Sequence, residues 1–155
     1  QNRHCIENIH GETLRIQGGM QVKLYLWERD DRAVSFWKRN LPAPSPLFQL
    51  EIATGFSALS PGDTVLIPSE QATLFRGQQL HLLTCGRCCK DTFTFSSREE
   101  ERAVIALMRT LDTPAGLLDP IELPATFPPH TGDFALLGAA AVRILSGQTG
   151  PLFFR

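Results

Sequence analysis

The stretch from Met20 to Lys38, MQVKLYLWERDDRAVSFWK, constrains the fold of this chain more than any other, because its side chains alternate with the period of a β-strand. The charged run 28–32 divides the stretch into two halves and is interpreted as a turn. The pattern therefore predicts a β-hairpin with one aliphatic face against a core. That face would carry Val22, Leu24, Leu26, Val34 and Phe36.

The opposite face of the predicted hairpin would carry Lys23, Tyr25, Trp27 and Trp37. A solvated sheet face usually carries Thr, Lys and Glu, so two tryptophans and the only tyrosine of the chain require an explanation. Two interpretations remain open. Either a second layer of the protein packs on these rings, or the rings form an exposed platform on which a flat ligand stacks.

Composition limits the classes of function. The chain has 155 residues, enough for one well-buried domain with or without the beginning of a second. Its net charge of -1 argues against binding nucleic acid through a large positive field, so any such binding must come from a local patch. No apolar run approaches the roughly 20 residues that span a bilayer, and no membrane partner is expected. Because the sequence opens on Gln1 without Met, we expect an excised fragment or a processed chain.

Short strands separated by turn residues follow the hairpin. A proline-rich connector occupies 41–46, and Pro61-Gly62-Asp63 is typical of a turn. The other predicted strands lie near Glu12–Gln17, Phe48–Ile52, Thr64–Ile67, Ala72–Phe75 and Gln79–Thr84. About five short strands at this spacing predict a mainly β protein built on a small five-stranded barrel.

The second half of the chain is predicted to add a helix and a tail. Ser96 or Ser97 is placed to cap a helix of about 97–112, which completes a first domain of 1–113. Its apolar stripe is Ala103, Val104, Leu107, Met108 and Leu111. Five prolines make 114–131 a linker or an extended segment. The segment 132–155 fits a helix followed by a strand as well as two strands, either as additional packing or as the start of a second module.

These elements resemble a known fold. The order of strands, with SPGDTV (60–65) opening one and FRGQQLHL (75–82) leading into the next, is similar to oligonucleotide-binding (OB) folds of the replication protein A, telomere-end and shieldin-like class. The resemblance covers roughly residues 12–95. It implies single-stranded DNA binding on the face of the second and third strands, where stacking contributes about 1–3 kcal/mol per base. The residues that it implicates are Lys23, Tyr25, Trp27, Arg32, Trp37, Lys38 and Arg39.

The cysteines are clumped, which favours a reducing compartment over a secreted disulfide scaffold, and with the resemblance favours the nucleus. Cys85 and Cys88 have a spacing that lets two thiolates bind one zinc ion, and Cys89 offers a third. His81 would share the face of Cys85 on a predicted strand. A second pair of cysteines with this spacing does not occur. Reduced structural cysteines, or a disulfide of Cys5 with one of the three, are the alternatives.

No catalytic motif occurs: phosphate loop, nucleotide-binding glycine motif, paired metalloprotease histidines and serine elbow are absent from the sequence. We therefore expect a non-catalytic module, and the resemblance implies that it belongs to a DNA-maintenance protein, active in repair or at telomeres. It would bind single-stranded DNA weakly, dock a partner subunit through the aromatic face or the 103–111 helix, or do both. The alternatives are a protein-interaction domain without nucleic-acid binding and an extracytoplasmic β-rich sensor or assembly domain.

Overall fold

The computed structural model describes residues 22–27, 31–41, 48–113 and 116–155 of the chain. In this part the helices are α2 (Asp31–Asn40) and α3 (Asp133–Leu145), with two short 3-10 helices, η1 (Phe56–Ala58) and η2 (Ser69–Phe75). The strands are β1 (Val22–Trp27), β2 (Phe48–Ala53), β3 (Thr64–Pro68), β4 (His81–Cys85), β5 (Phe93–Arg98), β6 (Arg102–Leu107), β7 (Leu111–Thr113), β8 (Gly116–Leu118), β9 (Ile121–Thr126) and β10 (Leu152–Phe153).

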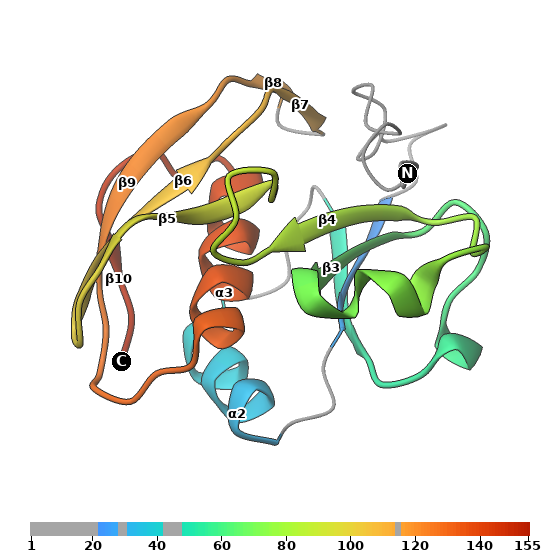
Figure 1. Cartoon of the computed structure of the whole chain (residues 1–155), viewed down its shortest axis with the longest axis horizontal. Coiled ribbons are helices and arrows are strands. Elements are labelled where there is room, and N and C mark those ends of the chain that lie inside the picture. The colour runs from blue at the N-terminus through green and yellow to red at the C-terminus, as the bar shows by residue number, and fades with distance from the viewer. Residues whose placement is uncertain (1–21, 28–30, 42–47, 114–115) are drawn as a thin grey trace.

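Eight strands form one sheet in the order β10-β9-β6-β5-β4-β3-β1-β2, and β7 pairs with β8 in a separate hairpin. Neighbouring strands from β2 to β5 are parallel. β6 is antiparallel to both β5 and β9, and β10 is parallel to β9. In Figure 1 the parallel strands β3 and β4 lie to the right and the antiparallel strands to the left, with α3 between them. The fold is a mixed α/β, sheet-rich one with a C-terminal helix.

The parallel strands are wound in two directions. The connection from β1 through α2 leads to β2 on one side of β1, whereas η2 leads from β3 to β4 on the other side. Right-handed crossovers that move in opposite directions must lie on opposite faces of a sheet. Accordingly α2 places Phe36 and Trp37 in one core cluster, and η2 places Phe75 in the other.

The helix-covered face is organised around α3, whose residues from Ala135 to Leu145 are buried except for the half-buried Arg143. An apolar segment rich in alanine forms a helix readily, and one that is apolar all round belongs inside a core. At Gly138 a Cβ would lie 3.1 Å from Leu26 Cδ2 and 3.1 Å from Trp37 Cζ2. The glycine therefore lets α3 approach β1 and α2 closely.

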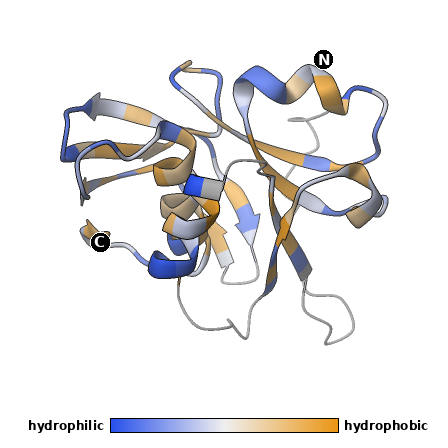
Figure 2. Cartoon of the chain, turned by 90° about the horizontal axis from the view of Figure 1, so that it is seen from below, coloured by the Kyte–Doolittle hydropathy of each residue, from blue (hydrophilic) through white to orange (hydrophobic). Residues whose placement is uncertain are grey.

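The opposite face of the parallel strands is covered by η1 and η2. Its core is Tyr25, Trp27, Ala53, Val65, Ile67, Phe75, Leu80 and Leu82. Trp27 lies at its centre, with its ring centroid 4.7 Å from that of Phe75 and its Nε1 donating to Gln71 Oε1 at 2.8 Å. Figure 2 shows the hydrophobic residues concentrated in the strands and the hydrophilic ones in the turns, as two buried faces require.

The predicted hairpin is correct for β1 and wrong for its second half, which is α2. The buried side chains of α2 follow the spacing of a helix, at Ala33, Phe36, Trp37 and Asn40. This helical period determines the structure of the segment, and the brief alternation of Val34 and Phe36 does not. As a result the three rings do not share a face. Tyr25 and Trp27 belong to one core cluster and Trp37 to the other. The packed-layer interpretation is the one that the structure supports.

The helix predicted at about 97–112 is also wrong. Residues 102–107 are β6, which pairs with β5 on one side and β9 on the other, and Glu99 N donates to Arg102 O at 2.7 Å in the turn before it. The β-branched Val104 and Ile105 suit a strand better than a helix. Because Ala103, Ile105 and Leu107 are buried in this strand, the 103–111 segment offers no helical docking face.

The other predicted strands and segments agree with the structure in part. The strands predicted at Phe48–Ile52, Thr64–Ile67 and Gln79–Thr84 are confirmed as β2, β3 and β4. Ala72–Phe75 lies in η2 rather than in a strand, and Glu12–Gln17 lies outside the described residues. The predicted linker 114–131 contains β8, which pairs with β7, and β9, which pairs with β6 in the main sheet, and 132–155 adopts the helix-then-strand alternative. The sheet has edges at β10 and β2, so the closed five-stranded barrel is not observed.

Candidate functional site

The predicted nucleic-acid-binding residues do not form one surface. Tyr25, Trp27 and Trp37 are 3%, 2% and 1% exposed, so none of the rings is accessible for stacking. The basic residues of this set, Lys23, Arg32, Lys38 and Arg39, are exposed. Trp37 is held from within, because its Nε1 donates to Ala135 O at 2.9 Å. The structure therefore separates the basic side chains from the aromatic rings.

The predicted metal ligands are separated in a similar way. Cys85 is buried in the helix-covered core, and burial, with a smaller contribution from the charge of Asp91, raises the pKa of its thiol well above the usual value. Cys88 and Cys89 are exposed in the loop that follows β4, and His81 begins that strand. All three cysteines are free thiols. Among the described residues no group of three His, Cys, Asp or Glu side chains is placed to hold a metal ion. Cys5 lies outside the described residues.

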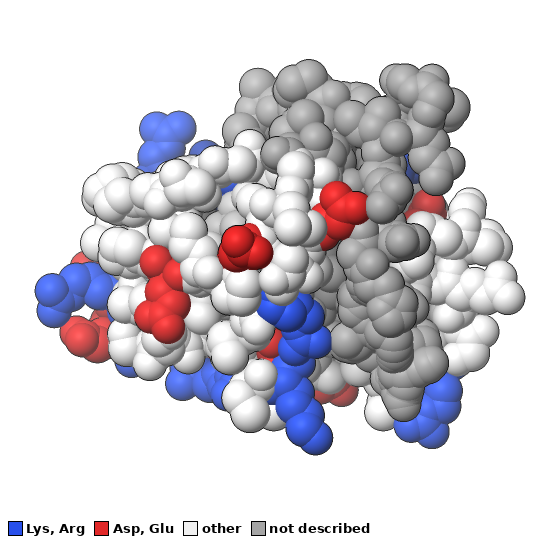
Figure 3. Space-filling view, turned by 90° about the horizontal axis from the view of Figure 1, so that it is seen from above, with Lys and Arg blue, Asp and Glu red and all other residues white. Residues whose placement is uncertain are grey.

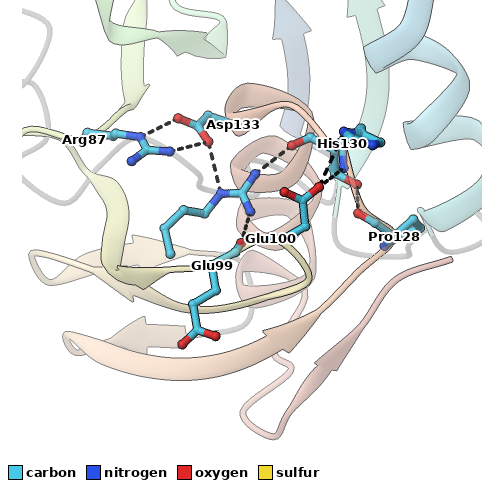
Figure 4. A network of polar contacts seen from close by, with 8 residues as sticks. Arg87, Glu99, Glu100, Pro128, His130 and Asp133 are labelled. Atoms are coloured by element: carbon cyan, nitrogen blue, oxygen red, sulfur yellow. Dashed lines mark hydrogen bonds and ion pairs between the residues drawn. The ribbon is translucent and has the colours of Figure 1, made fainter.

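A network of polar contacts surrounds the start of α3 (Figure 4). Asp133, the first residue of α3, accepts from Arg87 Nε at 2.6 Å and from Arg98 Nε at 3.2 Å. Partial burial alone would raise the pKa of Asp133, but hydrogen bonds and charges from the two guanidinium groups outweigh it and lower that pKa. Arg98 also stacks over Phe127, 4.8 Å from its ring centroid. The network thus joins the loop after β4, the end of β5 and the start of α3.

A second pair fixes the segment that enters α3. Glu100, in the turn between β5 and β6, accepts from the backbone N of His130 at 3.1 Å, and the same oxygen lies 3.4 Å from His130 Nδ1. His130 has a φ of 65°, a left-handed conformation that costs energy for a residue with a side chain. Thr131 Oγ1 donates to Pro128 O at 2.7 Å. These contacts hold the imidazole at the surface.

A groove of about 440 Å³ lies between α2 and the entry to α3. We call it the cationic groove. It is lined by Arg32, Ala33, Phe36, Arg39, Pro128, Pro129, His130, Thr131, Gly132, Phe134 and Ala135. Three of its side chains, Arg32, Arg39 and His130, are or can be cationic, its apolar side chains come from alanine, proline and phenylalanine, and none of the described lining residues is a carboxylate. The positive end of the α3 dipole lies beside it, which adds to the attraction for an anion.

A smaller cavity of about 340 Å³ adjoins the groove and shares His130 with it. We call it the mixed-charge cavity. Its lining is Arg87, Arg98, Glu99, Glu100 and His130, so positive and negative groups face the same space. Figure 4 shows Glu100 beside His130 and Arg87 on the far side of Asp133.

Most of these residues escaped the sequence analysis. Arg32 and Arg39 were named for another role, but Arg87, Arg98 and Asp133 were not, and nothing in the sequence placed Glu100 beside His130. Their contacts join residues 46, 35 and 30 positions apart, which no local pattern reveals. The rigid Pro128-Pro129 pair followed by Gly132 before an apolar run was the available indication of a fixed entry to a helix.

Three further observations concern the whole described surface, the lengths of the helices and the similarity of the chain to known proteins. On the face seen in Figure 3, Lys and Arg side chains are interspersed with Asp and Glu rather than gathered into one positive surface. Neither helix of the described part is long and apolar enough to cross a membrane. Comparisons with protein-family models, curated proteins and solved structures found no match.

Proposed function

We propose that this chain is a non-catalytic binding module that docks an acidic segment of a partner protein in the cationic groove. The observation that carries the proposal is the lining: it combines three groups that are or can be cationic with alanine, proline and phenylalanine side chains, and no carboxylate is among the described lining residues. Arg presents a fixed fork of donors that suits carboxylates. Charge complementarity therefore favours an acidic ligand with an apolar side chain.

The geometry of α2 predicts how far apart the acidic residues of the ligand lie. Arg32 and Arg39 are seven residues apart on α2, which places them on the same side of the helix about 10 Å apart. An extended peptide rises about 3.3 Å per residue, and its side chains alternate between two faces, so only residues an even number apart share a face. Two acidic residues at positions i and i+4, about 13 Å apart, are within reach of the two long arginine side chains, with an apolar residue at i+2 on the same face over Phe36 and Phe134.

Protein docking is favoured over single-stranded DNA binding by the state of the aromatic residues. Binding without sequence preference needs exposed rings on which bases stack as well as a positive track for the phosphates. Here the rings that would stack are in the two cores, and the net charge is -1. An oligonucleotide is therefore the competing ligand in the test rather than the expected one.

The test is fluorescence anisotropy with a labelled extended peptide that carries Asp at i and i+4 and Leu at i+2. We expect saturable binding that weakens with salt, because exposed charges are screened. The same peptide with Asn in place of Asp should bind far less. Arg32→Gln and Arg39→Gln should each weaken binding by about 1 kcal/mol, or about fivefold in Kd.

The matched control is Lys38→Gln, which removes an exposed charge of α2 that does not line the groove. Its Kd should stay close to that of the unchanged chain. If Lys38→Gln weakens binding as much as Arg32→Gln, the attraction is a general charge effect and the groove is not the site. Tighter binding of a single-stranded oligonucleotide than of the peptide would instead favour the DNA-binding alternative.

A further inference from the structure

One histidine determines how many positive charges line the cationic groove. Arg32 and Arg39 keep their charges throughout the pH range in which proteins stay folded. Histidine is the side chain whose charge ordinarily changes between about pH 5 and 8. His130 is the lining residue of this kind, because the others are arginine, alanine, phenylalanine, proline, threonine and glycine. The positive charge of the groove therefore rises by one when His130 gains a proton.

The imidazole of His130 lies at the boundary between the cationic groove and the mixed-charge cavity, since it lines both. It is exposed, so it exchanges protons with solvent and is accessible to a ligand. The backbone N of His130 donates to Glu100 Oε2 at 3.1 Å, and the same oxygen lies 3.4 Å from Nδ1. Because the backbone hydrogen bond does not involve the imidazole, it holds His130 in place in both protonation states.

Glu100 is the negative charge that acts on the groove when His130 is neutral. Through the groove, the imidazole faces Arg32 and Arg39. The other charged groups around the mixed-charge cavity are compensated by ion pairs, namely Arg102 with Glu99 and Asp133 with Arg87 and Arg98. With a neutral His130, the charge of Glu100 repels an acidic ligand, whereas a protonated His130 compensates that charge and attracts the ligand.

We propose that His130 and Glu100 make docking in the cationic groove proton-dependent, so that an acidic peptide segment binds more tightly below about pH 6 than at about pH 8. This inference rests on the proposed function and concerns the regulation of the same site. By thermodynamic linkage, protonation that strengthens docking is itself favoured by docking, so the complex takes up protons as it forms. The Asp residues of the ligand stay ionised in this range, because the ordinary pKa of Asp is about 3.9.

The experiment repeats the anisotropy titration with the Asp-containing peptide at fixed salt from about pH 8 to about pH 5.5. We expect the Kd of the unchanged chain to fall about fivefold over this range. His130→Asn should remove the change, and asparagine suits this position because it tolerates a left-handed backbone conformation. His130→Lys, whose charge is permanent in this range, should bind at the upper pH as tightly as the unchanged chain binds at the lower one.

Proton uptake separates the charge of His130 from a structural loss of binding. Titration calorimetry in two buffers of different ionisation enthalpy gives the number of protons that accompany docking. At about pH 6.5 the unchanged chain should take up a fraction of a proton, and His130→Asn should take up none. Glu100→Gln keeps an acceptor for the backbone N of His130 and should bind more tightly than the unchanged chain at about pH 8.

The two proposals fail in different ways. A peptide that binds at no pH overturns the docking function, and the inference about His130 with it. Binding whose Kd does not change with pH leaves docking intact and overturns the role of His130. A pH dependence that persists in His130→Asn has the same meaning, because another group then controls the affinity. Weaker binding by Glu100→Gln at the upper pH would contradict the repulsion assigned to Glu100.

Discussion

The two faces of the parallel strands are covered by different kinds of structure, and their side chains differ accordingly. Where α2 and α3 cover the sheet, β1 contributes Leu24 and Leu26, and the helices fill most of the space. Where the thin η1 and η2 cover it, β1 contributes Tyr25 and Trp27 instead. Large aromatic side chains supply the volume that a helix supplies on the other face. An aromatic stripe on a strand can therefore indicate a thinly covered core rather than a ligand platform.

The largest effect is expected from removing the ring that joins the two helices. Trp37→Ala should lower the free energy of unfolding by about 4 kcal/mol, because it leaves a cavity in the helix-covered core and removes the hydrogen bond from Trp37 Nε1 to Ala135 O. Chemical denaturation measures the loss. A loss below about 1 kcal/mol would mean that α2 is not a fixed part of this core.

A smaller loss is expected from the thinly covered face. Phe56 packs on Trp27 with ring centroids 5.1 Å apart, yet Phe56 remains 39% exposed. Phe56→Ala should therefore lower the free energy of unfolding by about 1–2 kcal/mol, well below the cost of a fully buried ring. It should also shift the tryptophan emission to longer wavelength, because Trp27 gains contact with water. An unchanged spectrum would contradict the role of Phe56 as a cover.

The helix-covered face should resist the addition of a methyl group. Gly138→Ala gains about 1 kcal/mol of helix propensity, but its Cβ meets Leu26 and Trp37 at 3.1 Å, and overpacking costs about 1–3 kcal/mol. The net expectation is a loss of about 1 kcal/mol in the free energy of unfolding. Gly150→Ala, where nothing lies within 4 Å of the added Cβ, is the matched control. Stabilisation by Gly138→Ala would show that the contact between α3 and β1 is looser than described.

The smallest effect concerns the start of α3 and depends on pH. The pKa of Asp133 is lower in the folded chain than its ordinary value, so its ion pairs stabilise the fold above the unfolded pKa of about 3.9. This contribution is lost as the pH falls through the folded pKa. Asp133→Asn should therefore be less stable than the unchanged chain near pH 7, and the difference should shrink below about pH 4. Denaturation midpoints from pH 2 to 7 measure it, and a constant difference would contradict the ion-pair explanation.

Sequence patterns predicted the strands in which apolar and polar side chains alternate over enough residues to be recognised. The strands β1 to β4 were found in this way, although the pairing of β1 with both β2 and β3 was not. The strand prediction for 34–37 was wrong because four residues of alternation also fit one face of a helix. Ser97 with Glu100 has the spacing of a capping box, but those residues form a tight turn between β5 and β6. The segment 102–107 is a strand because it pairs with β9, and such pairing depends on residues elsewhere in the chain rather than on the local sequence.

The site was harder to predict than the fold. Arg32 and Arg39 were identified as exposed basic residues, but the groove that they line needs 128–135 from the far end of the chain. The aromatic rings that were expected beside these arginines are buried in the two cores instead. Burying a large aromatic ring stabilises the fold, whereas an exposed ring does not. Cys88 and Cys89 were noticed for their spacing, while the turn that exposes them depends on Asp91.

The buried position of α3 has a consequence for the order in which the chain folds. Trp37 contacts Ala135, which lies 98 residues further along, and Gly138 meets β1. During synthesis on the ribosome, β1, α2, β3 and β4 emerge first, and α2 alone covers part of the helix-covered face until residue 145 has been made and α3 can complete it. Long-range contacts of this kind slow folding and leave apolar surface exposed in the meantime. A nascent chain stalled before α3 should therefore be captured by chaperones, whereas one that includes α3 should be released.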